Sequence, residues 1–506
     1  MLKTFQRALL PSQSNLIRSA SHGPVLSPDS FQFVLGSSSH PTLSRAVVEC
    51  VQQVKSKLGP DRTPHLCQLF VTADSYASRN IRFGGAYVRE CLSGSGDDAP
   101  VVIGGVVQSL LGSGSGGITG QGVSLMAASL PNVRLFPFHT TDTALPELES
   151  GSWRDLISGN ASSSSGAIAD RPRERTAGIL LSEPHFTAVE ELLGRLRGVL
   201  PQAPWLGGVL QHAAWGPGAS LRGALFLNSE TYDEGAVGCI MRGPLRFDQL
   251  CWQGCRPVGR IVEVTEAKGN IVTQLDDLPA LEVFQKLWLD MDMSDRMLPL
   301  KLGLDASGSG SAFITRNLAG FNVTPEQSSL QVAVSEVAEG SLLQLHVEDA
   351  KWSQAGIRTC LQEYADHLPG ALAQDPSQLG AWLYSCEETS HDEEAAMAKT
   401  MPDLPLQGAR CRAQFGQWGA DERATMLASS SNFGFLQHAA TWDGICSVNE
   451  GQTWSMHSMS LDTKVMAAPG WEHCQGNTAP ERKALATQYT TTDQRAFSCR
   501  KGLQKP

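Results

Sequence analysis

The chain has 506 residues, which exceeds the roughly 250–300 residues at which one hydrophobic core usually stops growing, so two or three domains are expected. Apolar residues make up 41% and charged residues 18% of the chain, a composition that excludes global disorder. The formal net charge of -11 argues against a nucleic-acid partner, and no apolar run approaches the roughly 18–20 residues of a membrane span.

The first 28 residues contain no Asp or Glu, and Lys3, Arg7 and Arg18 lie there among leucines and serines. This pattern is typical of a transit peptide, so we predict a leader over residues 1–28 that directs the chain to a mitochondrion or chloroplast. The alternative interpretation is a disordered basic tail on a cytoplasmic protein.

The next two hundred or so residues alternate between strand and helix patterns. An apolar stripe with helical spacing, Leu43, Val47, Val51, Val54 and Leu58, predicts a helix that ends before Gly59-Pro60. A second helix is expected over 187–200. Strands are expected at 31–35, 65–72, 100–107, 122–127, 133–138, 177–181 and 204–209, and an exposed linker at 158–175.

The glycine-rich tract from Gly112 to Gly122 resembles loops that cradle phosphates. However, no Lys-Ser or Lys-Thr follows it, and no strand, tight turn and helix with a downstream acid surround it. We therefore interpret the tract as a mobile hairpin or lid and not as a nucleotide loop.

A second half begins near Gly235. Strands are expected at 235–241, 259–266, 301–304, 312–316, 342–347 and 380–385, and helices at 279–289 and 349–368. Beyond Met401 the periodicity weakens. The predicted fold is α/β or α+β, with two glycine-rich domains of mixed sheet and helix over 30–234 and 235–400 and a poorly ordered tail over 401–506.

The 12 cysteines do not form CxxC pairs, and Cys251 and Cys255 are the closest two. Because no second pair follows them, we predict no metal, no other cofactor and a reducing compartment. Catalytic signatures such as GxSxG and HExxH are absent from the sequence, so we expect no enzyme. A Cys255 nucleophile with a distant histidine is the alternative.

The segment 253–259 combines residue types that suit a binding turn. Gly254 and Gly259 permit unusual backbone conformations, Pro257 fixes its own φ, and Arg256 offers a planar fork that matches a carboxylate. The alternative is a tight turn in which Arg256 pairs with an acid of the chain itself.

Several short motifs then resemble one family in collinear order. The runs 235–238, 253–259, 264–265, 269–270, 275–282 and Arg316-Asn317 before Gly320 are similar to the C-terminal half of FIST-domain proteins. The runs 100–105, 122–125 and 206–208 resemble the N-terminal FIST domain. The resemblance implies a FIST N-type domain over 30–234 and a FIST C-type domain over 235–400.

The resemblance also implies a function. FIST proteins are intracellular sensory modules of signal transduction that are thought to bind small ligands such as amino acids, and eukaryotic members join F-box segments as a substrate-binding part. The sequence departs from the family's motifs at two places, and each departure removes a positive charge. Glu348-Asp349 stands where the family has Arg-Asp, and the residues after Cys386 lack the family's arginine. An F-box-like segment before Phe31 is not evident.

We therefore predict a non-enzymatic sensor that binds a small carboxylate, with a protein-interaction adaptor as the alternative. The partner is a small molecule, such as an amino acid, or a protein. The predicted ligand-binding residues are Gly254, Cys255, Arg256, Pro257, Gly259, Thr265, Arg316 and Asn317.

Overall fold

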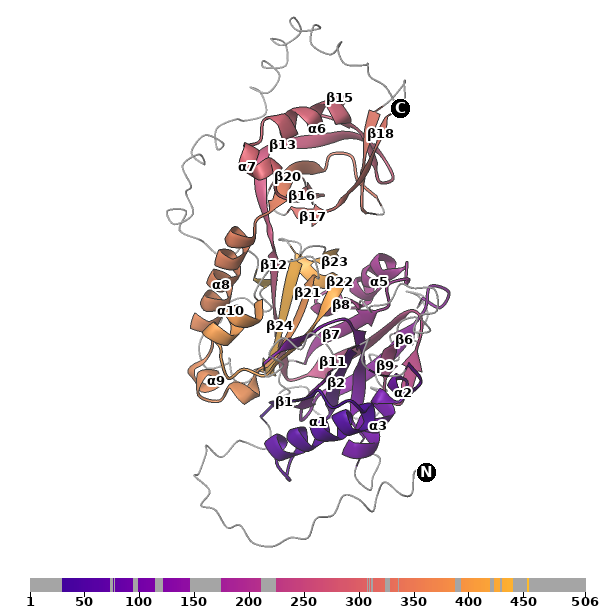
Figure 1. Cartoon of the computed structure of the whole chain (residues 1–506), viewed down its shortest axis with the longest axis vertical. Coiled ribbons are helices and arrows are strands. Elements are labelled where there is room, and N and C mark those ends of the chain that lie inside the picture. Colours follow the sequence, from indigo (N-terminus) through magenta and orange to yellow (C-terminus); the bar gives the residue numbers. More distant parts are fainter. Residues whose placement is uncertain are drawn as a thin grey trace, which may run out of the picture. The chain divides into compact units, whose positions relative to one another are not determined.

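A computed structural model describes residues 30–72, 76, 78–93, 99–113, 122–145, 174–210, 224–306, 308, 310, 313–323, 328–334, 336–386, 393–418, 423–427, 430–439 and 453–454 (Figure 1). The predicted leader, most of the glycine-rich tract and nearly all of the predicted linker lie outside these residues. The described chain is a mixed α/β structure of three sheets with helices, which confirms the predicted fold class.

The first sheet has the strand order β1-β5-β2-β3-β9-β10. Its strands are β1 (Gln32–Ser38), β2 (Leu66–Thr72), β3 (Val101–Val107), β5 (Val123–Ser129), β9 (Leu225–Leu227) and β10 (Glu230–Tyr232). β2 and β3 are parallel, and α2 (Ser78–Ile81) and α3 (Gly84–Leu92) lie between them in the chain. Helix α1 (Leu43–Leu58) buries the predicted apolar stripe against this sheet.

The second sheet has the order β25-β12-β24-β21-β22-β8-β7-β11-β6, and β4 and β23 also pair with β22. Its strands are β4 (Leu110–Gly112), β6 (Arg134–Thr140), β7 (Arg175–Ser182), β8 (Trp205–Leu210), β11 (Ala236–Gly243), β12 (Leu245–Gln253), β21 (Gly380–Cys386), β22 (Leu406–Trp418), β23 (Arg423–Leu427), β24 (Ser430–His438) and β25 (Thr453–Trp454). Helix α5 (Val189–Val199) connects the parallel strands β7 and β8, and α10 (Glu393–Thr400) connects the parallel strands β21 and β22.

The structure corrects the start of the predicted tail. β22 and β24 fall inside the region expected to be irregular, yet they lie in the middle of the second sheet. Buried polar residues such as Gln414 in β22 and Asn432 in β24 interrupt the apolar run that would mark a buried strand. The second sheet also crosses the boundary expected near Gly235, because β11 pairs with β6 and β7.

The third sheet has the order β17-β16-β20-β13-β14-β19-β18, with β15 paired to β14. Its strands are β13 (Cys255–Lys268), β14 (Ile271–Leu275), β15 (Leu278–Pro279), β16 (Leu300–Asp305), β17 (Ile314–Arg316), β18 (Leu318–Val323), β19 (Ser328–Val332) and β20 (Leu342–Glu348). Helix α6 (Ala280–Leu289) buries Val283, Phe284 and Leu287 in the core of this sheet, and α7 (Met293–Arg296) follows it.

Helix α8 (Ala350–Asp366) continues from β20 onto the second sheet. Its N-cap, Asp349, accepts hydrogen bonds from the backbone N–H groups of Lys351 and Trp352. Tyr364 stacks on Phe435 of β24 with ring centroids 4.2 Å apart. The short helices α9 (Gly370–Gln374) and η3 (Pro376–Gln378) then lead into β21.

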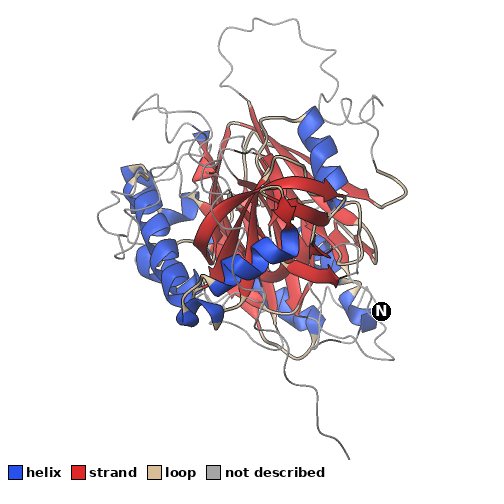
Figure 2. Cartoon of the chain, turned by 90° about the horizontal axis from the view of Figure 1, so that it is seen from above, coloured by secondary structure: helices blue, strands red, loops and turns tan. Residues whose placement is uncertain are grey.

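The first and second sheets share one apolar core, to which Phe33 and Ile103 contribute from the first sheet and Leu206 and Trp382 from the second. Phe33 meets Trp382 edge to face, with ring centroids 5.9 Å apart. Figure 2 shows the strands in the interior with helices on the flanks. In the described part of the chain, every helix is too short or too polar to cross a bilayer.

Candidate functional site

The segment predicted to be a binding turn is a connection between two sheets. β12 ends at Gln253 in the second sheet, and β13 begins at Cys255 in the third sheet, with the buried Gly254 between them. Gly259 is exposed, has a φ of 70°, and lies at a register shift of β13 between Val258 and Val262. The expected turn is therefore extended chain with a bulge, for which the glycine provides the left-handed conformation.

Arg256 forms ion pairs with two carboxylates of the chain. Its Nη2 lies 2.7 Å from Oδ1 of Asp295, and its Nε lies 3.4 Å from Oδ2 of Asp349. Burial alone would lower the pKa of Arg256, but the two carboxylates outweigh it and raise the pKa. This geometry corresponds to the internal pairing, which was the alternative to ligand binding.

Cys255 and Asn317, two of the predicted residues, lie near a buried lysine. Lys301 Nζ is 2.6 Å from Oδ1 of Asn317 and 3.0 Å from Oε1 of Glu348. Glu348 is opposite Cys255 in the β13–β20 pair. Burial and, to a lesser extent, Glu348 raise the pKa of Cys255 to about 12, although Lys301 opposes them. This environment favours the neutral thiol, which is a poor nucleophile.

We expect Cys255 to resist alkylation in the folded protein, because it is buried and protonated. Iodoacetamide treatment followed by peptide mass spectrometry should leave Cys255 unmodified until denaturant is added. Cys91, which is only partly buried, is the internal control and should react before Cys255. Alkylation of native Cys255 at the rate of the unfolded chain would contradict this prediction and reopen the nucleophile hypothesis.

The remaining predicted residues do not join this group. Thr265 Oγ1 accepts a hydrogen bond from the Asp277 N–H at 3.0 Å, and Pro257 lies in β13 opposite His346. Arg316 is buried on β17, where burial lowers its pKa and Glu190 of α5 raises it. Arg256 and Arg316 therefore respond to different acids, and the structure does not combine them into one anion site.

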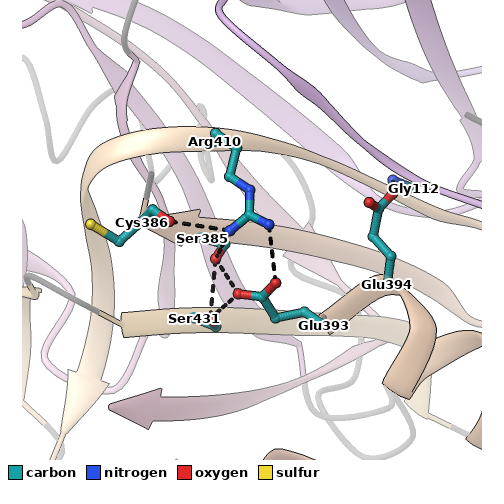
Figure 3. A network of polar contacts seen from close by, with 7 residues as sticks. All are labelled: Gly112, Ser385, Cys386, Glu393, Glu394, Arg410 and Ser431. Atoms are coloured by element: carbon teal, nitrogen blue, oxygen red, sulfur yellow. Dashed lines mark hydrogen bonds and ion pairs between the residues drawn. The ribbon is translucent and has the colours of Figure 1, made fainter. Parts of the chain in front are cut away.

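A polar network that sequence reasoning missed lies at the end of β21 (Figure 3). Arg410 Nη1 donates to Ser385 Oγ at 2.9 Å and to the Cys386 carbonyl at 3.2 Å, and its Nη2 lies 3.3 Å from Glu393 Oε2. Glu393 Oε1 also accepts hydrogen bonds from the hydroxyls of Ser385 and Ser431. We call these residues, Ser385, Cys386, Glu393, Arg410 and Ser431, the Arg410 network.

The Arg410 network lies where several strands end beside β22. Cys386 and Leu210, the last residues of β21 and β8, both pair with Cys411, and Gly112, the last residue of β4, pairs with Gln407. Glu394 accepts a hydrogen bond from the Gly112 N–H at 2.6 Å. β21 runs parallel to β22, whereas β8 and β4 run antiparallel to it, so the ends of β21 and β8 meet beside Cys411 from opposite directions.

The arginine of this network is partly accessible although its counterion is not. The Glu393 side chain has 0% exposure, whereas the Arg410 side chain has 20%. Figure 3 shows the guanidinium turned toward Glu393 and Ser385, while the Cys386 sulfur points away.

Sequence reasoning missed Arg410 because it lay in the predicted irregular tail. The one signal was an arginine within a run of small and apolar residues, Leu406, Gly408, Ala409 and Cys411. Among the described residues, no group of three or more His, Cys, Asp or Glu side chains could hold a metal ion.

Similar proteins come from mycobacteria. An uncharacterized protein of Mycobacterium bovis and one of Mycobacterium tuberculosis (strain CDC 1551) are each 29% identical over 238 residues, which cover 44% of this chain and 57% of the relative. Another uncharacterized M. tuberculosis protein is 29% identical over 280 residues, 50% of this chain and 67% of the relative. The chain thus spans somewhat more than half the length of the first relatives. Residues 65–278, the stretch from β2 through β14, match the family model of the FIST N domain.

Proposed function

We propose that this chain is a sensory module that binds a small carboxylate-bearing molecule, amino acids among the candidates, and that it does so without catalysis. The FIST N domain supports a sensory or signalling role in general terms. We also propose that the chain beyond the matched region completes a FIST C-type domain. The choice of a carboxylate rests on the Arg410 network.

The observation that carries the proposal is a partly exposed guanidinium that is fixed in place at the ends of several strands. Arg410 is held by the buried Glu393 carboxylate, by Ser385 and by the Cys386 carbonyl. An arginine whose position is already fixed loses little entropy when it binds an anion, and its planar fork matches a carboxylate. Arg410 is therefore a proposed anion contact alongside Arg256, which is likewise paired with carboxylates of the chain.

A thermal-shift screen of amino acids and small dicarboxylates tests the proposal. A ligand that binds only the folded state stabilises it by about 2.7 kcal/mol at a hundred times its Kd, which raises the melting temperature. Arg410→Lys should remove the response, because lysine keeps a positive charge near Glu393 but lacks the fork.

The matched control is Arg82→Lys, which changes an exposed arginine paired with Asp233 at 2.6 Å. This variant should respond to the ligand like the unchanged chain. A normal response from Arg410→Lys would exclude Arg410 as the ligand contact. A panel without any hit would argue against the sensor and favour the adaptor alternative.

A further inference from the structure

Exposed apolar side chains gather on one part of the third sheet. Of the seven large apolar residues that are exposed in the described part of the chain, six lie between residues 278 and 321, and Phe83 is the seventh. Single exposed apolar residues are ordinary, but a concentration of them commonly marks an interaction surface. The helices α6 and α7 contribute three of the six, and Met297, the C-cap of α7, is a fourth.

These four residues lie around one arginine. The Trp288 side chain is 39% exposed, and Leu289, Met293 and Met297 are 60%, 68% and 80% exposed. The Arg296 guanidinium lies over the Trp288 ring, with its carbon 5.3 Å from the ring centroid, and its Nη2 donates to the Leu289 carbonyl at 2.6 Å. Met293 begins α7 and Met297 is its C-cap, so the two residues lie one helical turn apart. We call these four residues the α6–α7 surface.

The α6–α7 surface extends toward β18. Phe284 lies one turn before Trp288 on α6, and its ring meets Phe321 edge to face, with centroids 5.3 Å apart. The Phe321 side chain is itself 47% exposed. Figure 1 shows α6 and α7 beside the sheet that contains β13, β16 and β20.

Two carboxylates lie within this surface. Asp290 and Asp292 are exposed between Leu289 and Met293, whereas Asp295 is already paired with Arg256. The nearby basic residues are Arg296, which donates to the carbonyls of Leu289 and Met291, and the exposed Lys286, one turn before Asp290. A partner that covers the surface therefore meets carboxylates at its rim, and a cationic partner complements them.

We propose that the α6–α7 surface docks a basic amphipathic helix of a partner protein. Methionine side chains are flexible and polarizable, so two exposed methionines beside a tryptophan can adapt to the apolar face of a helix. Lysines or arginines that flank that face would lie near Asp290 and Asp292. The site is separate from the Arg410 network, so either proposal can fail without the other.

The test measures binding of a labelled synthetic helix to the full chain by fluorescence anisotropy. The probe is a peptide of about 18 residues made of leucine and lysine, with the leucines at helical spacing. A matched peptide in which glutamate replaces lysine serves as the charge control. We expect the lysine peptide to bind, with an affinity that falls as salt increases, and the glutamate peptide not to bind.

Two double variants and one single variant test whether the peptide binds at the α6–α7 surface. Met293→Ser with Met297→Ser should weaken binding by about tenfold or more, and Asp290→Asn with Asp292→Asn should weaken it and flatten its salt dependence. Phe83→Ser, which removes an exposed apolar residue elsewhere, should bind normally. All of these side chains are exposed, so the melting temperatures should change little.

The proposal would be overturned if all variants bound the lysine peptide as tightly as the unchanged chain does. It would also be overturned if the unchanged chain bound the glutamate peptide as tightly as the lysine peptide. Sedimentation of the unchanged chain provides a second criterion. A dimer that the methionine variant dissociates would show that the surface serves a second copy of the chain, and this outcome would also overturn the proposed helix.

Discussion

Gly408→Ala is expected to prevent folding or to destabilise the protein by several kcal/mol. A Cβ at this position would lie 1.9 Å from the Leu383 carbonyl oxygen and 2.8 Å from its carbonyl carbon. These are backbone atoms of β21, which pairs in parallel with β22 in the middle of the sheet. The clash can therefore be relieved only by moving one strand from the other, which would break ladder hydrogen bonds and open the core.

Gly194→Ala is the matched control, because it makes the same chemical change where there is room. Gly194 lies within α5, is exposed, and would have no heavy atom within 4 Å of its new Cβ. Alanine should stabilise this helix by about 0.5–1 kcal/mol. Soluble yield and urea unfolding followed by circular dichroism measure both effects. A Gly408→Ala protein that unfolds at the same urea concentration as the unchanged chain would contradict the β21–β22 pairing.

Local patterns predicted the elements that have one clear apolar side or one buried run. The stripe from Leu43 to Leu58 became α1, and the runs near Leu66 and Val101 became β2 and β3. In contrast, β24 contains Ser431, Asn432 and Gln437, which are buried only because they lie beside distant hydrogen-bond partners. A polar strand of this kind has no local signature, because its burial depends on pairs that form between distant segments.

The candidate site was hard to predict for the same reason. Arg256 was predicted as a ligand contact because its planar guanidinium can pair with a carboxylate. The carboxylates that pair with it, those of Asp295 and Asp349, are far along the chain. Cys255 and Asn317 were predicted from the sequence, and both lie near Lys301, which carried no local signal. Arg410 became visible only when the structure placed it beside Ser385 and Glu393. The residue types therefore indicated candidate residues, whereas the contact partners that decide the role of each residue could not be predicted from the sequence.

Arg410→Met is expected to destabilise the folded chain by about 3–5 kcal/mol, because it leaves a buried carboxylate without its cation. Glu393 is fully buried, and its other described partners are the hydroxyls of Ser385 and Ser431. Two neutral hydrogen bonds do not replace the charge that offsets the desolvation of a carboxylate. Urea unfolding of the variant at neutral pH measures the loss.

The double variant Arg410→Met with Glu393→Gln separates charge from packing. Glutamine keeps an oxygen that can accept hydrogen bonds from Ser385 and Ser431, but it carries no charge that would be left buried without a counterion. The double variant should therefore recover much of the stability lost in Arg410→Met. Glu393→Gln alone completes the cycle and should cost less than Arg410→Met, because the remaining arginine is partly exposed and can be hydrated. If the two single losses simply add in the double variant, Arg410 and Glu393 are not coupled, and the fixed guanidinium on which carboxylate binding depends would have no support.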